Sequence, residues 1–194
     1  VFRVDGTILS ADRLDRRLAL RTLSLLDEPG VTPWLFADGQ WYARTLDNDH
    51  VPHEIKSAGV DPVIRGDFSS FLDRVDKIVG VSDDHERLTN LDAAVATALA
   101  GEATVARSQP YYLDITAPRG NKGDGVRALA DHFGIPLGET AVLGDQNNDL
   151  AMFAIAGMSV AMGQAHTNVR AAATYVARSN DDDGVADAID RLIL

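Results

Sequence analysis

Short apolar runs alternate with longer amphipathic segments from residue 140 to the end of the chain. Runs of this length bounded by turn residues are typical of strands, and the segments between them are long enough to form helices. Parallel strands need such helical crossovers, so this stretch predicts βαβ units and a parallel sheet. The expected strands are 140–143, 158–161 and 174–177, and the expected helices are 148–155, 166–173 and 183–193.

Residues 1–115 predict a different architecture, in which short strands mix with helices as an α+β domain with an antiparallel sheet. Asp38-Gly39 gives the clearest hairpin signal, between 33–37 and 40–43, and Asp5-Gly6 gives a weaker one. We place a domain boundary near residue 116. The other elements expected in this half are helices at 12–26, 68–75 and 84–100, a polar connection or short helix at 50–59, and strands at 77–81, 104–106 and 111–115.

Composition excludes several classes of function. With 18 Lys plus Arg against 29 Asp plus Glu, the formal net charge is −11, which repels nucleic-acid backbones and anionic membranes. The chain has no cysteine, so a disulfide framework, a thiolate nucleophile and a thiolate zinc site are excluded. Neither a secretory leader nor an apolar run of about 20 residues is visible, so we expect no membrane partner and a cytoplasmic location.

The most informative segment is 141–149, where an apolar strand ends at Gly144 and the carboxylates Asp145 and Asp149 follow. Strand ends of an open parallel sheet face the ligand crevice, where Asp145 would be a hard oxygen ligand for Mg²⁺. Asn148 and Asp149 would begin the next helix, where backbone N–H groups favour an anion. The alternative is structural: Asp145 ends a turn and Asp149 caps a helix.

A second candidate is Lys122, which directly follows the expected helix cap Asn121; Gly134 is placed to end that helix. A lysine is unfavourable at a helix start, and neutralisation of a bound phosphate would explain it. The alternative is an ordinary exposed lysine. Carboxylates for a metal and a lysine for an anion together indicate phosphoryl chemistry.

The histidines and the aromatic residues add no stronger site. The five histidines show no metal-ligand spacing, and we expect them to be structural or exposed. The aromatic residues of the first half are expected to pack its sheet, with the lining of a substrate pocket as the alternative. These aromatic residues are Trp34, Phe36, Trp41 and Tyr42.

Four segments in order resemble the haloacid dehalogenase superfamily, specifically Cof-type phosphatases with a type IIB cap. They are NKG at 121–123, GDQNNDLAMF at 144–153, AGMSVAMGQA at 156–165 and SNDDDGVA at 179–186. Segments 77–84 and 108–114 resemble the cap of this family. The resemblance implies a type IIB cap over 1–115 and the C-terminal half of a Rossmann-like catalytic core over 116–194.

The resemblance also implies roles for individual residues in a Mg²⁺-dependent phosphatase that forms a phosphoaspartyl intermediate. Lys122 matches the phosphate-binding lysine and Asn148 the asparagine that contacts the substrate. Asp145 matches the metal-ligand aspartate, and Asp149 matches the second acidic residue of the metal site. The implied partner is a small phosphorylated metabolite, such as a sugar phosphate, bound under a cap that sets specificity.

The nucleophile motif of the family, Asp-x-Asp-Gly-Thr, has only an imperfect counterpart in residues 3–7, where Arg3 replaces the nucleophile. Too few residues precede it for a buried strand of about 5–6 residues, so we interpret it as a decoy within the cap. We expect the true nucleophile on an N-terminal segment outside this chain, and the chain alone to be inactive. The alternatives are a degenerate nucleophile site, a phosphotransferase or mutase, and a non-catalytic module that binds a phosphorylated ligand.

Overall fold

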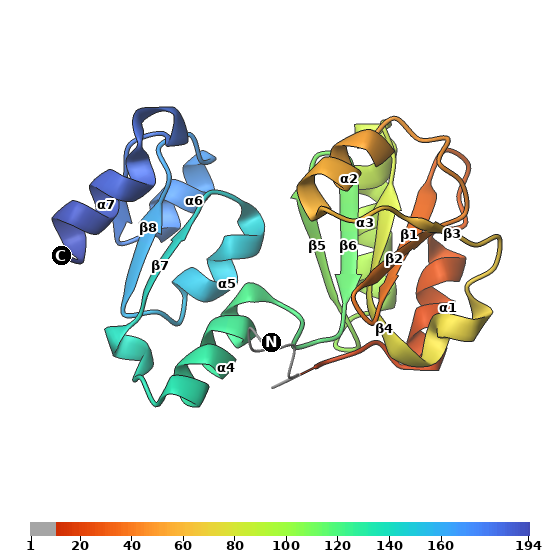
Figure 1. The fold of residues 1–194 in the computed structure, drawn as a ribbon, viewed down its shortest axis with the longest axis horizontal. Coiled ribbons are helices and arrows are strands. Elements are labelled where there is room, and N and C mark those ends of the chain that lie inside the picture. The colour runs from red at the N-terminus through yellow and green to blue at the C-terminus, as the bar shows by residue number, and fades with distance from the viewer. Residues whose placement is uncertain (1–10) are drawn as a thin grey trace. The chain divides into compact units, whose positions relative to one another are not determined.

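The computed structural model describes residues 11–194, and these residues form two compact units. The first unit is Ala11–Gly120 and the second runs from Asn121 to Leu194 (Figure 1). The boundary between them lies between Gly120 and Asn121, a few residues beyond the position near 116 that the sequence suggested. The hairpin expected around Asp5-Gly6 and the decoy motif at 3–7 lie outside the described residues.

The first unit is an α+β domain, as expected from its mixed pattern of strands and helices. Its six-stranded sheet has the order β3-β2-β1-β4-β6-β5, and every neighbouring pair is antiparallel except β2 and β3. Its elements are α1 (Arg16–Leu25), β1 (Thr32–Ala37), β2 (Gln40–Ala43), α2 (Val51–Ala58), β3 (Val63–Ile64), the 3₁₀ helix η1 (Ser69–Arg74), β4 (Val75–Val81), α3 (His85–Ala98), β5 (Thr104–Gln109) and β6 (Tyr112–Thr116).

The predicted hairpin at Asp38-Gly39 is confirmed. Both residues have positive φ, 53° and 74°, which is the backbone of a type I′ turn. The helix expected over 68–75 is instead the 3₁₀ helix η1. Strand β3 was not expected, because its two residues carry no local signal and pair only with β2.

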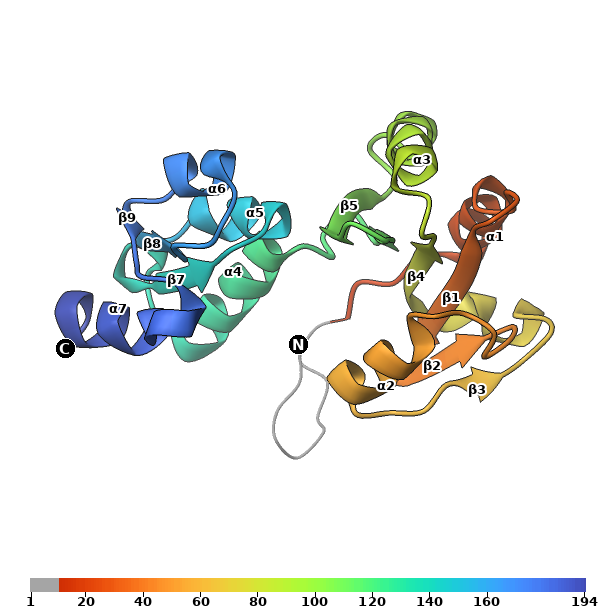
Figure 2. The same ribbon diagram turned by 90° about the horizontal axis from the view of Figure 1, so that it is seen from above.

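The two faces of this sheet pack against different helices. Alternate residues such as Leu35 and Ile78 pack on the side of α1 and α3, and Trp34 and Val79 pack on the side of α2. Figure 2 shows α1 and α3 on one side of the sheet and α2 on the other.

A buried tyrosine holds α2 to the sheet. The hydroxyl of Tyr112 lies 3.2 Å from the Glu54 carboxylate of α2. Burial, and then the negative charge of Glu54, raise the pKa of Tyr112 above its ordinary value. The hydroxyl therefore stays protonated and donates to Glu54.

The second unit contains a parallel sheet, as the alternating pattern predicted, with the strand order β7-β8-β9. A core of apolar residues, including Val142, Phe153 and Val169, packs the helices on this sheet. Its elements are α4 (Lys122–Phe133), the 3₁₀ helix η2 (Leu137–Glu139), β7 (Ala141–Gly144), the 3₁₀ helix η3 (Asn147–Asp149), α5 (Leu150–Phe153), β8 (Met158–Ala161), α6 (Thr167–Ala172), β9 (Tyr175–Val176), the 3₁₀ helix η4 (Asn180–Asp182) and α7 (Gly184–Leu192).

Helix α4 has the caps that its sequence predicts. The Asn121 side chain accepts a hydrogen bond from the Asp124 backbone N–H at 3.0 Å, and Gly134 ends the helix with φ 66°. The helix expected at 148–155 is shorter, because the 3₁₀ turn η3 precedes α5. None of the helices in the described part of the chain is long and apolar enough to cross a membrane.

Replacement of Gly39 by Ala should lower the free energy of unfolding of the first unit by about 1 kcal/mol, because an L side chain disfavours positive φ. Urea unfolding followed by tryptophan fluorescence measures this, since both tryptophans of the chain pack in this unit. The control is Gly66→Ala, where an added methyl meets no atom within 4 Å and φ is not positive. Equal effects at the two positions would contradict the turn assignment.

Candidate functional site

The centre of the site is the carboxylate of Asp149, which is 1% exposed. One oxygen, Oδ2, accepts hydrogen bonds from the backbone N–H groups of Asp145 and Gln146 at 2.8 and 2.9 Å. The other oxygen, Oδ1, accepts from the ammonium group of Lys122. This carboxylate therefore fixes the loop that follows β7 and joins it to the first residue of α4.

Two glycines make this arrangement sterically possible. A Cβ on Gly144 would lie 2.5 Å from the carboxyl group of Asp149, and a Cβ on Gly123 would lie 2.6 Å from the backbone carbonyl oxygen of Ala151. Glycine at the end of β7 thus leaves room for the Asp149 carboxyl group to reach the backbone N–H groups of the loop. Glycine in the first turn of α4 brings Lys122 close to α5, and Figure 1 shows these two helices packed together.

Lys122 keeps hydrogen-bonding capacity for a ligand. Its side chain is half exposed although its partner Asp149 is buried. An ammonium group has three N–H donors, and the bond to Asp149 uses one of them. An anion bound at this position would contact the Lys122 ammonium group, whose orientation is fixed by Asp149.

Asp145 and Asn148 lie on the same loop and also present oxygen atoms. The Asp145 carboxylate is half-buried, and its one hydrogen bond within the described residues comes from Gln146 Nε2 at 3.5 Å. The Asn148 Oδ1 atom is buried and has no hydrogen-bond partner among residues 11–194. A buried acceptor without a partner is costly, so this atom is suited to a donor or a cation supplied by a ligand.

These atoms fit Mg²⁺ as part of a ligand set. Mg²⁺ prefers hard oxygen ligands, keeps several waters and takes one or two carboxylates from the protein. The available oxygens are those of Asp145 and Asn148, because both oxygens of Asp149 already accept hydrogen bonds. Over residues 11–194, no three acidic or histidine side chains converge closely enough to hold a metal ion.

Two further contacts join the loops at this edge of the sheet, and the sequence did not single out these residues for a site. Asn168 of α6 donates to Asn147 Oδ1 at 2.7 Å, which ties α6 to the loop after β7. The side chain of Gln164, after β8, accepts from the backbone N–H of Asn180, after β9, at 3.1 Å. Both pairs depend on tertiary proximity and have no local sequence signal.

The structure brings two of the four candidate residues into direct contact, Lys122 and Asp149, and places Asp145 and Asn148 on the loop that Asp149 orders. It does not place Asn148 and Asp149 in the first turn of an α-helix, because they lie in the 3₁₀ turn η3. Their roles toward a phosphate and a metal stay predictions.

A family model described as haloacid dehalogenase-like hydrolase matches residues 3–189. The chain is 35% identical over 94 residues to Phosphatase YwpJ of Bacillus subtilis, covering 48% of this chain and 33% of that protein. It is 28% identical over 218 aligned positions to a Phosphoglycolate phosphatase of Methanosarcina acetivorans, covering 99% and 95% of the two chains.

Solved structures show the same fold. A haloacid dehalogenase-like hydrolase from Bacteroides thetaiotaomicron superposes with a TM-score of 0.81 at 26% identity, covering 97% of this chain and 71% of that one. The chain therefore spans about a third of the Bacillus relative and most of the Bacteroides structure.

Replacement of Asp149 by Asn should lower the free energy of unfolding of the second unit by about 2 kcal/mol, because it removes a buried charge that accepts three hydrogen bonds. The amides of Asp145 and Gln146 should also exchange hydrogen faster. Urea unfolding followed by circular dichroism and amide exchange by NMR measure the two effects. In the control Asp145→Asn, the free energy of unfolding should change by less than about 0.5 kcal/mol; a reversed order would refute the central role of Asp149.

Proposed function

This chain belongs to the haloacid dehalogenase-like hydrolases, and on that premise we propose that the protein containing it is a Mg²⁺-dependent phosphatase of small phosphorylated metabolites. The observation that carries the proposal is the contact between Lys122 and the buried Asp149, beside the less engaged carboxylate of Asp145. Phosphate binding needs a positioned cation, here Lys122, and Mg²⁺ binding needs a carboxylate with free oxygen atoms, here Asp145.

Each candidate residue takes a distinct role in this proposal. Lys122 binds a phosphoryl oxygen and stabilises the charge that spreads over the phosphoryl group. Asn148 contacts the substrate through its side-chain amide. Asp149 positions both Lys122 and the loop, and supports the metal site without a free oxygen of its own.

Asp145 is the proposed metal ligand, joined by water and by oxygens from the phosphate. When bound, Mg²⁺ neutralises negative charge on the phosphate oxygens. The protein contributes by holding Asp145 at the end of β7, where two backbone N–H groups are fixed by Asp149.

The proposed nucleophile is an aspartate on an N-terminal segment of the protein outside this chain. A phosphoaspartyl intermediate needs a carboxylate in line with phosphorus, and both carboxylates of the loop already have other roles. The first unit, proposed as a type IIB cap, would select the substrate.

The full-length protein should hydrolyse phosphate esters with Mg²⁺, lose activity on chelation and regain it when Mg²⁺ is restored. Asp145→Asn should lower its kcat/KM about a hundredfold, because the proposed metal ligand is lost. Chain 1–194 alone should show no turnover at equal concentration. A panel of sugar phosphates, nucleotides and pyridoxal phosphate would supply the measurement.

Asp131→Asn is a matched control, because Asp131 is an exposed carboxylate on α4 whose side chain makes no hydrogen bond within residues 11–194. It should leave kcat/KM within about twofold. Equal turnover by the chain and the full-length protein would show that the nucleophile has been misassigned. Phosphate binding without turnover by the full-length protein would favour a non-catalytic binding module.

A further inference from the structure

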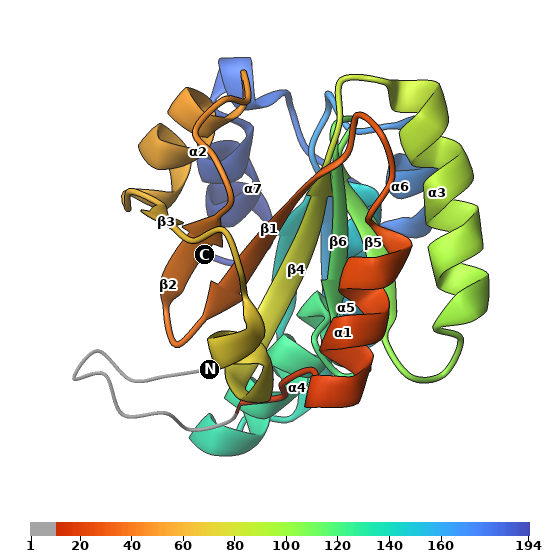
Figure 3. The same ribbon diagram turned by 90° about the vertical axis from the view of Figure 1, so that its right-hand side faces the viewer.

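Helix α2 of the first unit packs on its sheet through few apolar side chains. Along this helix only Val51 is buried, and Ile55 is partly buried beside it. Figure 3 shows α2 on the side of the sheet opposite α1 and α3. Two apolar residues bury much less surface than the full apolar face of a longer helix. The polar contacts of α2 therefore decide how firmly it stays packed.

The cluster under α2 contains two buried donors that favour opening. Trp34 and Trp41 are fully buried in the cluster that Val51 joins, with their ring centroids 4.7 Å apart. Their indole N–H groups have no hydrogen-bond acceptor among residues 11–194. A buried donor without an acceptor is unfavourable, and water that entered the cluster on opening of α2 would satisfy it. The packed position of α2 thus needs further contacts to hold it.

Two polar contacts hold α2 in this position. The first joins Glu54 to the Tyr112 hydroxyl, whose pKa is raised by burial and then by Glu54, so this contact does not change near neutral pH. The second comes from His50, the N-cap residue of α2, whose Nε2 atom lies 2.7 Å from Asp83 Oδ1 after β4. Histidine is the side chain that ordinarily changes its charge between pH 5 and 8. The second contact is therefore the one that responds to pH.

Two connected loops surround the His50 imidazole. Its ring stacks on Tyr111, with 3.9 Å between the centroids and 11° between the planes. The Ser82 backbone N–H donates to the Tyr111 carbonyl at 3.2 Å, so the loop after β4 and the turn between β5 and β6 are joined. The His50 side chain is 16% exposed, whereas that of Asp83 is 70% exposed. The loops thus present a carboxylate and an aromatic face to a ring that is largely withdrawn from water.

The surroundings of His50 contain groups that favour its protonated form and groups that oppose it. Asp83 favours the imidazolium through a charge-assisted hydrogen bond, and the face of the Tyr111 ring attracts a cation. Burial opposes the charge, as does the positive end of α2, which has no side-chain N-cap. The other ionisable side chains on or next to the surrounding elements are Asp47, Asp49, His53, Glu54, Asp84, His85, Arg107 and Tyr112. Carboxylates predominate among them, so they add to the effect of Asp83.

We propose that His50 is a pH-dependent latch for α2. When protonated, His50 pairs with Asp83 and holds α2 on the tryptophan cluster; when neutral, it keeps a weaker hydrogen bond and α2 opens more often. A histidine that gains a carboxylate partner on packing stabilises the packed state at low pH, and this contribution is lost as the pH rises through its titration. The latch lies within the first unit and does not depend on the proposed function.

Amide hydrogen exchange of α2 in chain 1–194 tests the latch. The Glu54 N–H donates to the His50 carbonyl at 2.9 Å and the Gly59 N–H to the Ile55 carbonyl at 3.0 Å, so both amides report opening. Their protection factors, which correct for the pH dependence of intrinsic exchange, should be about threefold higher at about pH 5.5 than at about pH 8. Acrylamide quenching of tryptophan fluorescence should be weaker at the lower pH, because packed α2 protects the tryptophan cluster.

Two variants distinguish a latch from a merely structural contact. Asp83→Asn should remove or reverse the pH dependence, because burial and the helix N-terminus then oppose the imidazolium without a paired carboxylate. His50→Gln keeps a side-chain N–H donor toward Asp83 but does not titrate, so it should remove the pH dependence while α2 stays packed. If His50→Gln loosens α2 at both pH values, the sign of the pH dependence in Asp83→Asn decides.

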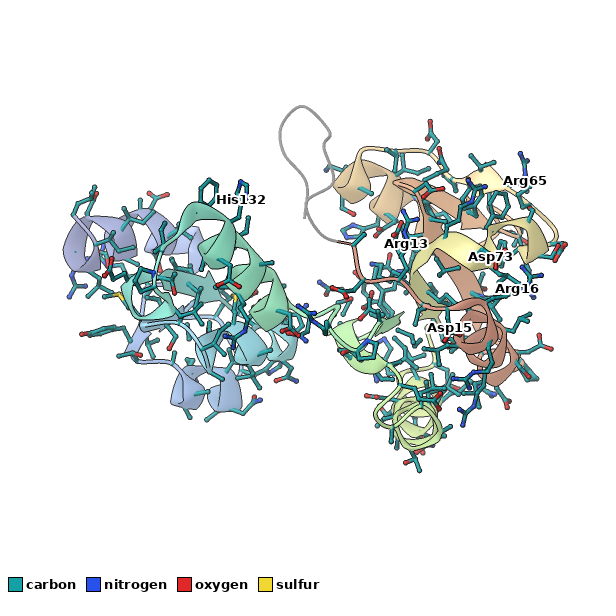
Figure 4. All side chains as sticks on the ribbon, turned by 90° about the horizontal axis from the view of Figure 1, so that it is seen from below. Arg13, Asp15, Arg16, Arg65, Asp73 and His132 are labelled. Atoms are coloured by element: carbon teal, nitrogen blue, oxygen red, sulfur yellow. The ribbon has the colours of Figure 1, made fainter. Side chains whose placement is uncertain are left out.

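The controls are two exposed histidines, His53 on α2 and His132 on α4, the latter labelled in Figure 4. His53→Gln and His132→Gln should leave the pH dependence of α2 as it is in the unmodified chain. Equal protection of α2 at the two pH values in the unmodified chain overturns the inference. A pH dependence that keeps its sign and size in Asp83→Asn, or that disappears in His53→Gln, overturns it as well.

Discussion

The second unit depends on one buried carboxylate. Asp149 accepts hydrogen bonds from two backbone N–H groups of its own loop and from the first side chain of α4. It therefore connects the end of β7 to a helix that begins more than twenty residues earlier. Burying a carboxylate is expensive unless its hydrogen bonds are made, so this geometry has few alternatives. The glycine at 144 is a consequence, because any side chain there would occupy the volume of the Asp149 carboxyl group.

The sequence predicted those parts of the fold whose signals are local. The caps of α4 at Asn121 and Gly134 and the turn at Asp38-Gly39 agree with the structure, because each depends on the conformational preferences of one or two residues. Strand β3 has no such signal, since its two residues become a strand only by pairing with β2. The 3₁₀ turn η3 was missed for a related reason. Its geometry follows from the Asp149 side chain turning back to Asp145 and Gln146.

The candidate site shows the same division between local and tertiary information. Lys122, Asp145, Asn148 and Asp149 could be named because they fall in recognisable segments next to a strand end and a helix start. Their hydrogen-bond partners could not be named, because separation along the chain does not predict which side chains meet. The pairing of Asn168 with Asn147 is visible only after folding, as is the burial of Asn148 Oδ1 without a hydrogen-bond partner in the described part of the chain. The diagonal contact of Lys77 with Asp114 similarly requires the register of β4 against β6.

The acidity of the chain bears on the proposed function. A net charge of −11 disfavours the approach of a phosphate ester, but this repulsion is screened over about 8–10 Å at physiological ionic strength. Close to the loop, Asp149 already balances the charge of Lys122 and Asp145 adds a further negative charge, so binding of a phosphate ester there depends on the proposed Mg²⁺. A second negative group on the substrate would meet the same unfavourable field. Under the proposed function, the charge of the chain therefore favours phosphate esters whose negative charge is confined to the phosphate group.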